Sequence, residues 1–156
     1  MAINNLFNLT NPLIFTDYMY SKKDNNLILV RLLPDEDVFE CLEKVCKKYK
    51  VKFASVVSFI GMLKDFEIAA YDGSSYVKVK KSEPHELCSI QGNILKDGAK
   101  YLFHFHAVLF NHEFKPIGGH LFSAKVNITN EIVLITSKVK ARRKPELEGI
   151  KGLYFD

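Results

Sequence analysis

The sequence has few cysteines and no long apolar run. Cys41 and Cys46 lie five residues apart on one predicted helix, so their side chains point in different directions, and Cys88 is isolated. An odd number of cysteines without framework spacing is typical of reduced thiols in a cytoplasm. No segment approaches the ~18 consecutive apolar residues that a membrane span needs. The N-terminus also lacks the basic and apolar regions of a signal peptide. We therefore expect a cytoplasmic protein that does not contact a membrane.

Several common catalytic and binding signatures are also missing. The sequence shows no Ser-His-Asp or Cys-His pattern, no glycine-rich phosphate loop, no internal repeat and no low-complexity segment. The charge is only mildly basic, because 22 lysines and arginines face 18 acidic residues. Such a balance permits an acidic partner without requiring one. Nucleic-acid binders concentrate their basic residues on one surface, whereas most lysines here are dispersed.

The 156 residues are the size of one ordinary domain. Residues 34–50 carry apolar side chains at helical spacing, with acidic residues at the start and lysines at the end, which predicts an amphipathic helix. Other segments predict strands separated by short turns. These strands cover residues 13–21, 27–33, 52–61, 62–72, 75–82, 85–95, 100–110, 116–128 and 131–139. The pattern predicts an α+β fold, with a mostly antiparallel sheet of about nine strands curled against one main helix.

Three of the five histidines lie in the apolar stretch of residues 101–120. His104 and His106 are two residues apart, so in a strand they share one face. His120 follows Gly118 and Gly119, far enough along for the chain to turn and return beside the first pair. Two neighbouring strands would then direct three imidazoles to one point. Three neutral imidazoles are the ligand set of open zinc sites, where a further position stays free for water or substrate.

A different interpretation of these histidines is that each is a core residue with a ring nitrogen bonded to a backbone carbonyl. That interpretation suits a single histidine better than a set of three. Three buried imidazoles without partners would leave polar atoms unsatisfied, at ~1–3 kcal/mol each. His112 falls in a predicted turn and His85 at the start of a strand, so we expect both at the surface.

Glu86 and Glu131 lie inside otherwise apolar strands. Beside a metal, either carboxylate could orient a histidine or carry a proton. Otherwise each would be a carboxylate at a sheet edge or subunit interface, paired with a lysine. Arg31, an unusual charge within an apolar strand, would hold an anionic substrate or pair across an interface.

Four segments together resemble the plant and prokaryote conserved (PPC) domain. They are "EPHELCSIQGNI" (83–94), "HFH" (104–106), "IGGHLFSAKV" (117–126) and "EIVL" (131–134), and "VRLLPDEDVFECL" (30–42) resembles the strand-to-helix entry of that family. The resemblance divides the chain into an N-terminal arm (1–13), the domain (14–139) and a charged C-terminal tail (140–156). The tail reads as an extended segment or a subunit-contact arm. One departure is Asp35, where the family often has glycine.

The resemblance implies a homotrimer and a divalent metal, zinc for preference, held by His104, His106 and His120. It also implies a fold-level likeness to acetolactate decarboxylase, a zinc lyase. Plant members carry an AT-hook for DNA, but "ARRKP" (141–145) lacks the glycine of that motif.

Two hypotheses follow from these observations. In the first, the metal takes a small oxygen-bearing ligand, and any lyase or hydrolase chemistry uses Glu86 or Glu131 as proton carrier. In the second, the protein is a non-enzymatic, DNA-associated or regulatory module, with DNA contact through the basic run at residues 138–144.

Overall fold

The computed structural model describes residues 19–147 and 150–156, so the predicted N-terminal arm and most of the predicted strand at 13–21 lie outside the described residues. The described residues form one helix and nine strands, as predicted, and the α+β class is confirmed. The elements are β1 (Tyr20–Asp24), β2 (Leu27–Leu32), α1 (Val38–Lys48), β3 (Phe53–Tyr71), β4 (Tyr76–Lys81), β5 (His85–Asp97), β6 (Lys100–Phe110), β7 (Pro116–Ser137), β8 (Ala141–Leu147) and β9 (Ile150–Phe155).

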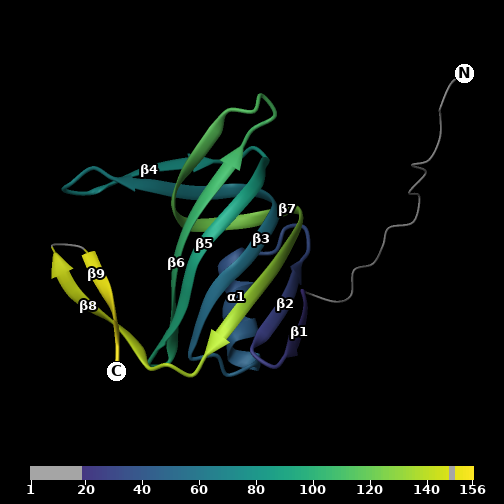
Figure 1. The fold of residues 1–156 in the computed structure, drawn as a ribbon. Helices are drawn as coiled ribbons and strands as arrows, with labels where there is room; N and C mark the ends of the chain where they lie inside the picture. The colour runs from purple at the N-terminus through teal and green to yellow at the C-terminus, as the bar shows by residue number, and fades with distance from the viewer. Residues whose placement is uncertain (1–18, 148–149) are drawn as a thin grey trace, which may run out of the picture.

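Seven strands form one antiparallel sheet in the order β1-β2-β7-β6-β5-β3-β4. The sheet curls on itself, because β3 also pairs with β7 along most of its length. Figure 1 shows the long strands β3, β5, β6 and β7 crossing the molecule, with α1 on one side of them. The two remaining strands, β8 and β9, pair only with each other and form a hairpin on the side of β6 away from α1.

Two pairs of predicted strands are continuous in the structure. Residues 52–61 and 62–72 belong to the single strand β3, and residues 116–128 and 131–139 belong to β7. Register shifts bend both strands without ending them. Gly61 sits at one bend with a φ of 136°, and a Cβ there would overlap the backbone of Thr129. Glycine thus allows a bend where the sequence pattern indicated a break.

Helix α1 begins later than residue 34, where the prediction placed it. The Asp37 carboxylate accepts hydrogen bonds from the backbone N–H groups of Phe39 and Glu40, at 2.9 Å each, and so caps the helix. Asp35, two residues earlier, has a φ of 69°, which is outside the helical region. This positive φ explains why glycine suits the position. Lys64 pairs with the Asp35 carboxylate at 2.6 Å, and this ion pair lowers its pKa.

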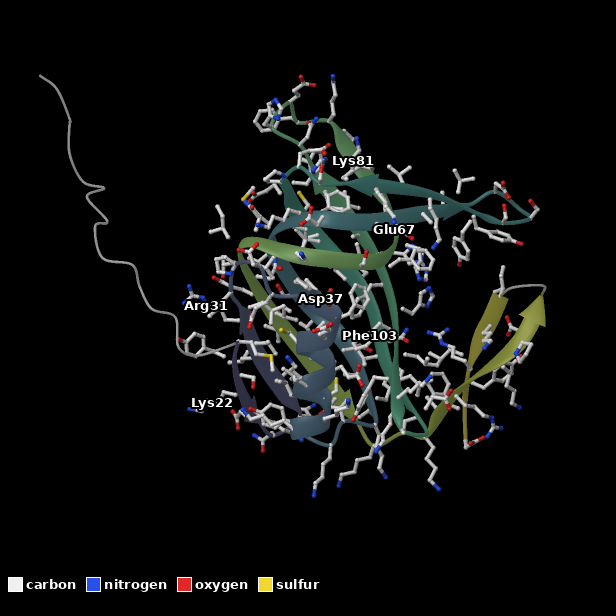
Figure 2. All side chains as sticks on the ribbon, turned by 180° about the vertical axis from the view of Figure 1, so that it is seen from behind. Lys22, Arg31, Asp37, Glu67, Lys81 and Phe103 are labelled. Carbon is white, nitrogen blue, oxygen red and sulfur yellow. The ribbon has the colours of Figure 1, made fainter. Side chains whose placement is uncertain are left out.

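The apolar face of α1 covers the inner surface of the curled sheet, as its spacing predicted. Val38, Leu42 and Val45 are fully buried, and Phe39 packs edge-on against Phe103 of β6, with ring centroids 5.4 Å apart. Figure 2 shows Phe103 on the strand beside the helix and Asp37 at the end of the helix. Cys41 and Cys46 are buried, unpaired thiols, and burial raises the pKa of each to about 12.

Candidate metal centre

Strands β6 and β7 place the three histidines together. His106 and His120 are direct register partners across the β6–β7 pair, and His104 lies two residues earlier on β6. Residues two apart share a face, so all three rings project from the same side of the sheet. As predicted, the chain turns after β6 and runs back antiparallel to it, which brings His120 beside His106.

That side is the outer face of the sheet, not the apolar core. Phe105, Ala107 and Leu109 alternate with the histidines along β6 and are buried. His104 and His120 are half-buried and His106 is exposed. The interpretation of all three as core residues therefore does not fit, because the residues that alternate with them along β6 are the ones that face the core.

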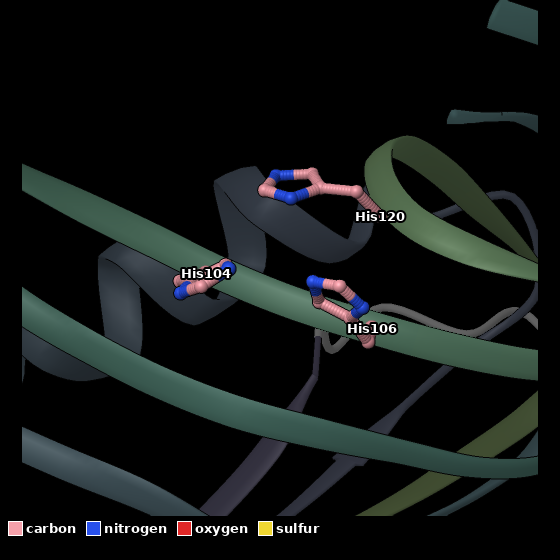
Figure 3. Close-up of side chains that lie close together, drawn as sticks. All are labelled: His104, His106 and His120. Carbon is pink, nitrogen blue, oxygen red and sulfur yellow. The ribbon is translucent and has the colours of Figure 1, made fainter. Parts of the chain in front are cut away.

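The three rings converge. One nitrogen from each ring can be chosen so that all three lie within 4.8 Å of one another, and the ring centroids are 5.1–5.3 Å apart. Figure 3 shows the rings around a common space, with nitrogens directed into it. Around a tetrahedral zinc ion the ligand nitrogens would be about 3.3 Å apart. Small side-chain rotations would close the remaining gap.

Close backbone packing at a glycine supports this geometry. Gly92 of β5 has a φ of 150°, and a Cβ there would overlap the carbonyl oxygen of His104. Its neighbour Asn93 pairs with His104 across β5 and β6. The Gly-Asn element of the sequence therefore brings β5 close under the first histidine.

His120 is poorly satisfied by the protein alone. Its Nδ1 atom is buried and has no hydrogen-bond partner among the described residues. His85 shows the contrast: it is buried, against our expectation of a surface position, and its Nδ1 lies 3.0 Å from the Glu83 carbonyl oxygen. His85 thus has the backbone partner of a core histidine, and His120 lacks one. His112 is exposed, as expected.

The surroundings keep two of the rings neutral. Burial, followed by the neighbouring His104, His106 and Arg143, lowers the pKa of His120 from 6.5 to about 4. Burial, then Arg143 and His106, also lowers the pKa of His104. Neutral imidazole is the form that binds metal. These rings are therefore ready to act as ligands at neutral pH without losing a proton.

Arg143 enters the site from the C-terminal hairpin. Its Nη2 atom lies 3.1 Å from His104 Nδ1 and 2.9 Å from Asn93 Oδ1. The sequence placed this arginine in the basic run at residues 138–144 and gave no sign that it reaches the histidines. Its neighbours in that run behave differently: Arg142 pairs with Asp156, and Lys144 lies over the Tyr154 ring.

A cavity of about 280 Å³ adjoins the histidines. Its lining combines His104, His120 and Arg143 with apolar and aromatic side chains, and aromatic rings crowd one histidine. The Phe122 ring centroid lies 4.6 Å from that of His120, and the Tyr76 ring lies 5.5 Å from both. The cavity lining therefore combines a few polar side chains with apolar and aromatic ones, which is the usual make-up of a small-molecule pocket.

The two candidate carboxylates lie elsewhere in this chain. Glu86 pairs with Phe110 of β6, four residues beyond His106, which is about 13 Å along a strand. Glu131 lies opposite Arg31 of β2 in the strand register, eleven residues after His120 on β7. Both side chains are exposed. Neither belongs to the cluster formed by the described metal-ligating side chains.

The sequence of residues 19–138 matches the family described as the Plants and Prokaryotes Conserved (PCC) domain. The chain belongs to this family. The resemblance carried by the Gly-Asn, His-x-His and Gly-Gly-His elements is thereby confirmed. No curated protein is significantly similar to the chain in sequence.

Solved structures share the fold of this PCC domain. A PPC protein from Pyrococcus horikoshii is 25% identical, with a TM-score of 0.72, over 87% of this chain and 94% of its own. A metal-containing protein from Archaeoglobus fulgidus is 28% identical, with a TM-score of 0.70, over 83% and 92%. A "putative DNA binding protein" from Bacteroides thetaiotaomicron is 20% identical, with a TM-score of 0.79, over 90% and 98%. The likeness to acetolactate decarboxylase stays a prediction.

Proposed function

We propose that this PCC-domain protein binds one divalent metal ion, zinc for preference, through His104, His106 and His120. The observation that carries the proposal is the convergence of three ring nitrogens within 4.8 Å. The unpartnered Nδ1 of His120 fits it, because a bound ion stabilises a buried polar atom that the protein leaves without a partner. The metal-containing relative from Archaeoglobus fulgidus supports the same reading.

Three protein ligands leave a tetrahedral ion with one open position. A bound zinc ion polarises an oxygen atom and lowers the pKa of water that it holds. The residues of this chain would shape what reaches that position: the cavity beside His104 and His120 offers space for a small oxygen-bearing molecule, and aromatic side chains form part of its lining. Glu86 and Glu131 stay candidate proton carriers for lyase or hydrolase chemistry. Both carboxylates lie several residues away from the histidines along extended strands and outside the histidine cluster, so a second subunit would have to supply them.

Metal analysis of protein purified without a histidine tag tests the proposal. We expect about one zinc-like ion per chain in the wild type. Each of His104→Ala, His106→Ala and His120→Ala should remove one of the three ligands and lower occupancy at least about tenfold. His112→Ala is the matched control, because this exposed histidine lies outside the cluster, and it should keep the full metal content. Wild-type protein free of metal after zinc loading would contradict the proposal.

We also propose that the protein is a cytoplasmic homotrimer. Exposed apolar side chains gather on the outer face of β2, β7 and β3, and we refer to this surface as the apolar face. It comprises Leu27, Leu29, Val57, Ile60 and Ile135. Large exposed apolar patches mark contact surfaces. Arg31 projects outward from β2 at the edge of this face, where an interface would cover it (Figure 2). No helix among the described residues is long and apolar enough to cross a bilayer.

The alternative function is a DNA-associated or regulatory module. One feature favours it: a hollow of about 490 Å³ near the end of α1 is lined by four lysines, Lys23, Lys50, Lys52 and Lys138. Lysines grouped in this way could contact phosphates. DNA affinity should then fall steeply with salt, and replacing Lys50 and Lys52 by glutamate should weaken it for all sequences alike. Absence of binding to duplex DNA at low salt would remove this alternative.

A further inference from the structure

Beyond the metal itself, the structure assigns a ligand class to the open position: we infer that it takes a small carboxylate with an apolar body, and that Arg143 binds this carboxylate. The inference rests on the proposed metal centre. It deepens that proposal, because a metal on three neutral histidines favours any anion, whereas Arg143 would add a preference for a planar carboxylate.

The first argument is the unbalanced charge of the cavity. Arg143 and Lys151 are among the residues that line it, and none of the described lining residues is acidic. Arg143 forms no ion pair with any described carboxylate, and burial lowers the pKa of its guanidinium. A partly buried guanidinium without a counter-ion costs free energy. An anion in the cavity would offset that cost.

The second argument concerns what Arg143 touches now. Among the described residues its guanidinium donates to three acceptors, all neutral: Asn93 Oδ1 at 2.9 Å, the Lys151 carbonyl oxygen at 3.3 Å and His104 Nδ1 at 3.1 Å. Asn93 and Lys151 hold the guanidinium in place from two sides. An arginine fixed in this way presents a planar fork of donors that suits a carboxylate.

The third argument is that metal binding must free Arg143 from His104. An arginine only donates hydrogen bonds, so Nδ1 of His104 is the acceptor and the proton of the neutral ring is on Nε2. If a metal binds Nε2, the proton moves to Nδ1, which can no longer accept. If a metal binds Nδ1, that lone pair is used. In either case Arg143 loses this partner at the moment when the open position is created beside it.

The apolar side chains of the cavity lining determine the shape and size of the part of the ligand that is not the carboxylate. Tyr76, Phe122 and Leu102 are also part of the cavity lining, and the cavity volume is about 280 Å³. Lys78 lies over the Phe122 ring but already pairs with Glu67 at 2.7 Å, so it offers less free charge than Arg143. A ring or a short branched chain fits this space, with its carboxylate toward the histidines.

The hairpin that carries Arg143 lies beyond residues 19–138, the part of the chain that matches the family. Phe155 of the same hairpin packs on Phe53, with ring centroids 6.2 Å apart. The hairpin is thus attached to the domain. The ligand preference would therefore come from the C-terminal hairpin acting on the histidine cluster of this chain.

Benzoate titrated into the zinc-loaded full-length protein tests the inference, with benzamide as the neutral probe of the same shape. Calorimetry measures affinity, and the visible spectrum of the cobalt-loaded protein shows whether the probe reaches the metal. We expect benzoate to bind at least about tenfold more tightly than benzamide. Arg143→Met should lower that preference to what the zinc ion alone provides. Arg143→Lys should fall between Arg143→Met and the wild type, because lysine keeps the charge without the fork. Arg142→Met is the matched control, since Arg142 pairs with Asp156, and it should behave as the wild type.

Metal affinity separates this role from a merely structural one. Because Arg143 competes for His104 and repels a cation, Arg143→Met should bind zinc more tightly, by roughly fivefold to tenfold. Weaker zinc binding would mean that Arg143 only positions His104, and would overturn the inference. Equal binding of benzoate and benzamide to a zinc-containing wild type would also overturn it while leaving the metal proposal intact. A wild type that takes up no zinc would contradict both the metal proposal and the carboxylate inference.

Discussion

At the scale of the residue, His120 has two properties that are unfavourable together in a protein without metal. Its ring is held uncharged at physiological pH, because its pKa is about 4, and one of its buried nitrogens has no hydrogen-bond partner among the described residues. Keeping a ring neutral by burial has a consequence for stability. The folded state resists protonation of His120, whereas the unfolded chain accepts the proton near 6.5.

The metal-free protein should therefore lose stability as pH falls from about 6.5 toward 4. The unfolded chain binds more protons than the folded protein in this range, so acid shifts the equilibrium toward unfolding. Urea unfolding of the apoprotein at several pH values measures the slope. His120→Gln should flatten it relative to the wild type. An equal slope in both proteins would show that other groups cause the pH dependence.

The sequence predicted these residues unevenly. The His-x-His spacing and the Gly-Gly-His return contained enough information to place three rings together, because strand periodicity fixes the face of every second residue. The same periodicity did not predict which face of β6 packs into the core. Arg143 could not be predicted at all, since its approach depends on how the hairpin packs on β5 and β6. No periodicity in a charged tail encodes that packing.

At the scale of the element, α1 depends on one side chain for its start. Asp37 satisfies two backbone N–H groups that have no partner within the helix. Asp37→Ala should lower the free energy of unfolding by about 1 kcal/mol, which corresponds to about 2–4 °C in Tm for a chain of this size. Thermal unfolding followed by circular dichroism measures the change. Asp37→Asn keeps the capping oxygen and should stay close to the wild type; a loss as large as that of the alanine variant would point to charge as the cause.

Element boundaries were predicted well where a turn is tight and poorly where a strand bends. The strand at residues 100–110 was predicted with the bounds of β6, because the Asp97-Gly98 turn precedes it. Residues 61–62 and 129–130 were taken as breaks between strands. In the structure the strands continue through them with shifted register, because Gly61 has the required φ and Asn130 is buried beside it. A bend and a turn have similar local composition, so pattern alone did not separate them.

At the scale of the whole molecule, the apolar face is the surface that an assembly would cover. Leu29 lies within it and is 50% exposed. Leu29→Lys would place a charge inside the proposed interface, where it has no partner, and should convert the proposed trimer largely to monomer. Light scattering coupled to size exclusion measures the mass.

Val77→Lys is a suitable control for Leu29→Lys, because Val77 is 55% exposed but lies on β4, away from the apolar face. It should leave the mass unchanged. If Val77→Lys dissociates the assembly and Leu29→Lys does not, the contact surface is on the β3–β4 hairpin instead. A monomeric wild type would contradict the trimer.

The long strand β7 also determines when the chain can fold. Its C-terminal half pairs with β2, which lies about a hundred residues earlier, and with the first half of β3. Pairings so distant in sequence must close large loops before they contribute stability, and they slow folding. During synthesis β2 cannot gain this neighbour until residues 130–135 have left the ribosome. Nearly the whole domain must therefore emerge before β2 is hydrogen-bonded to β7. We expect the domain to fold in one cooperative step near the end of its synthesis.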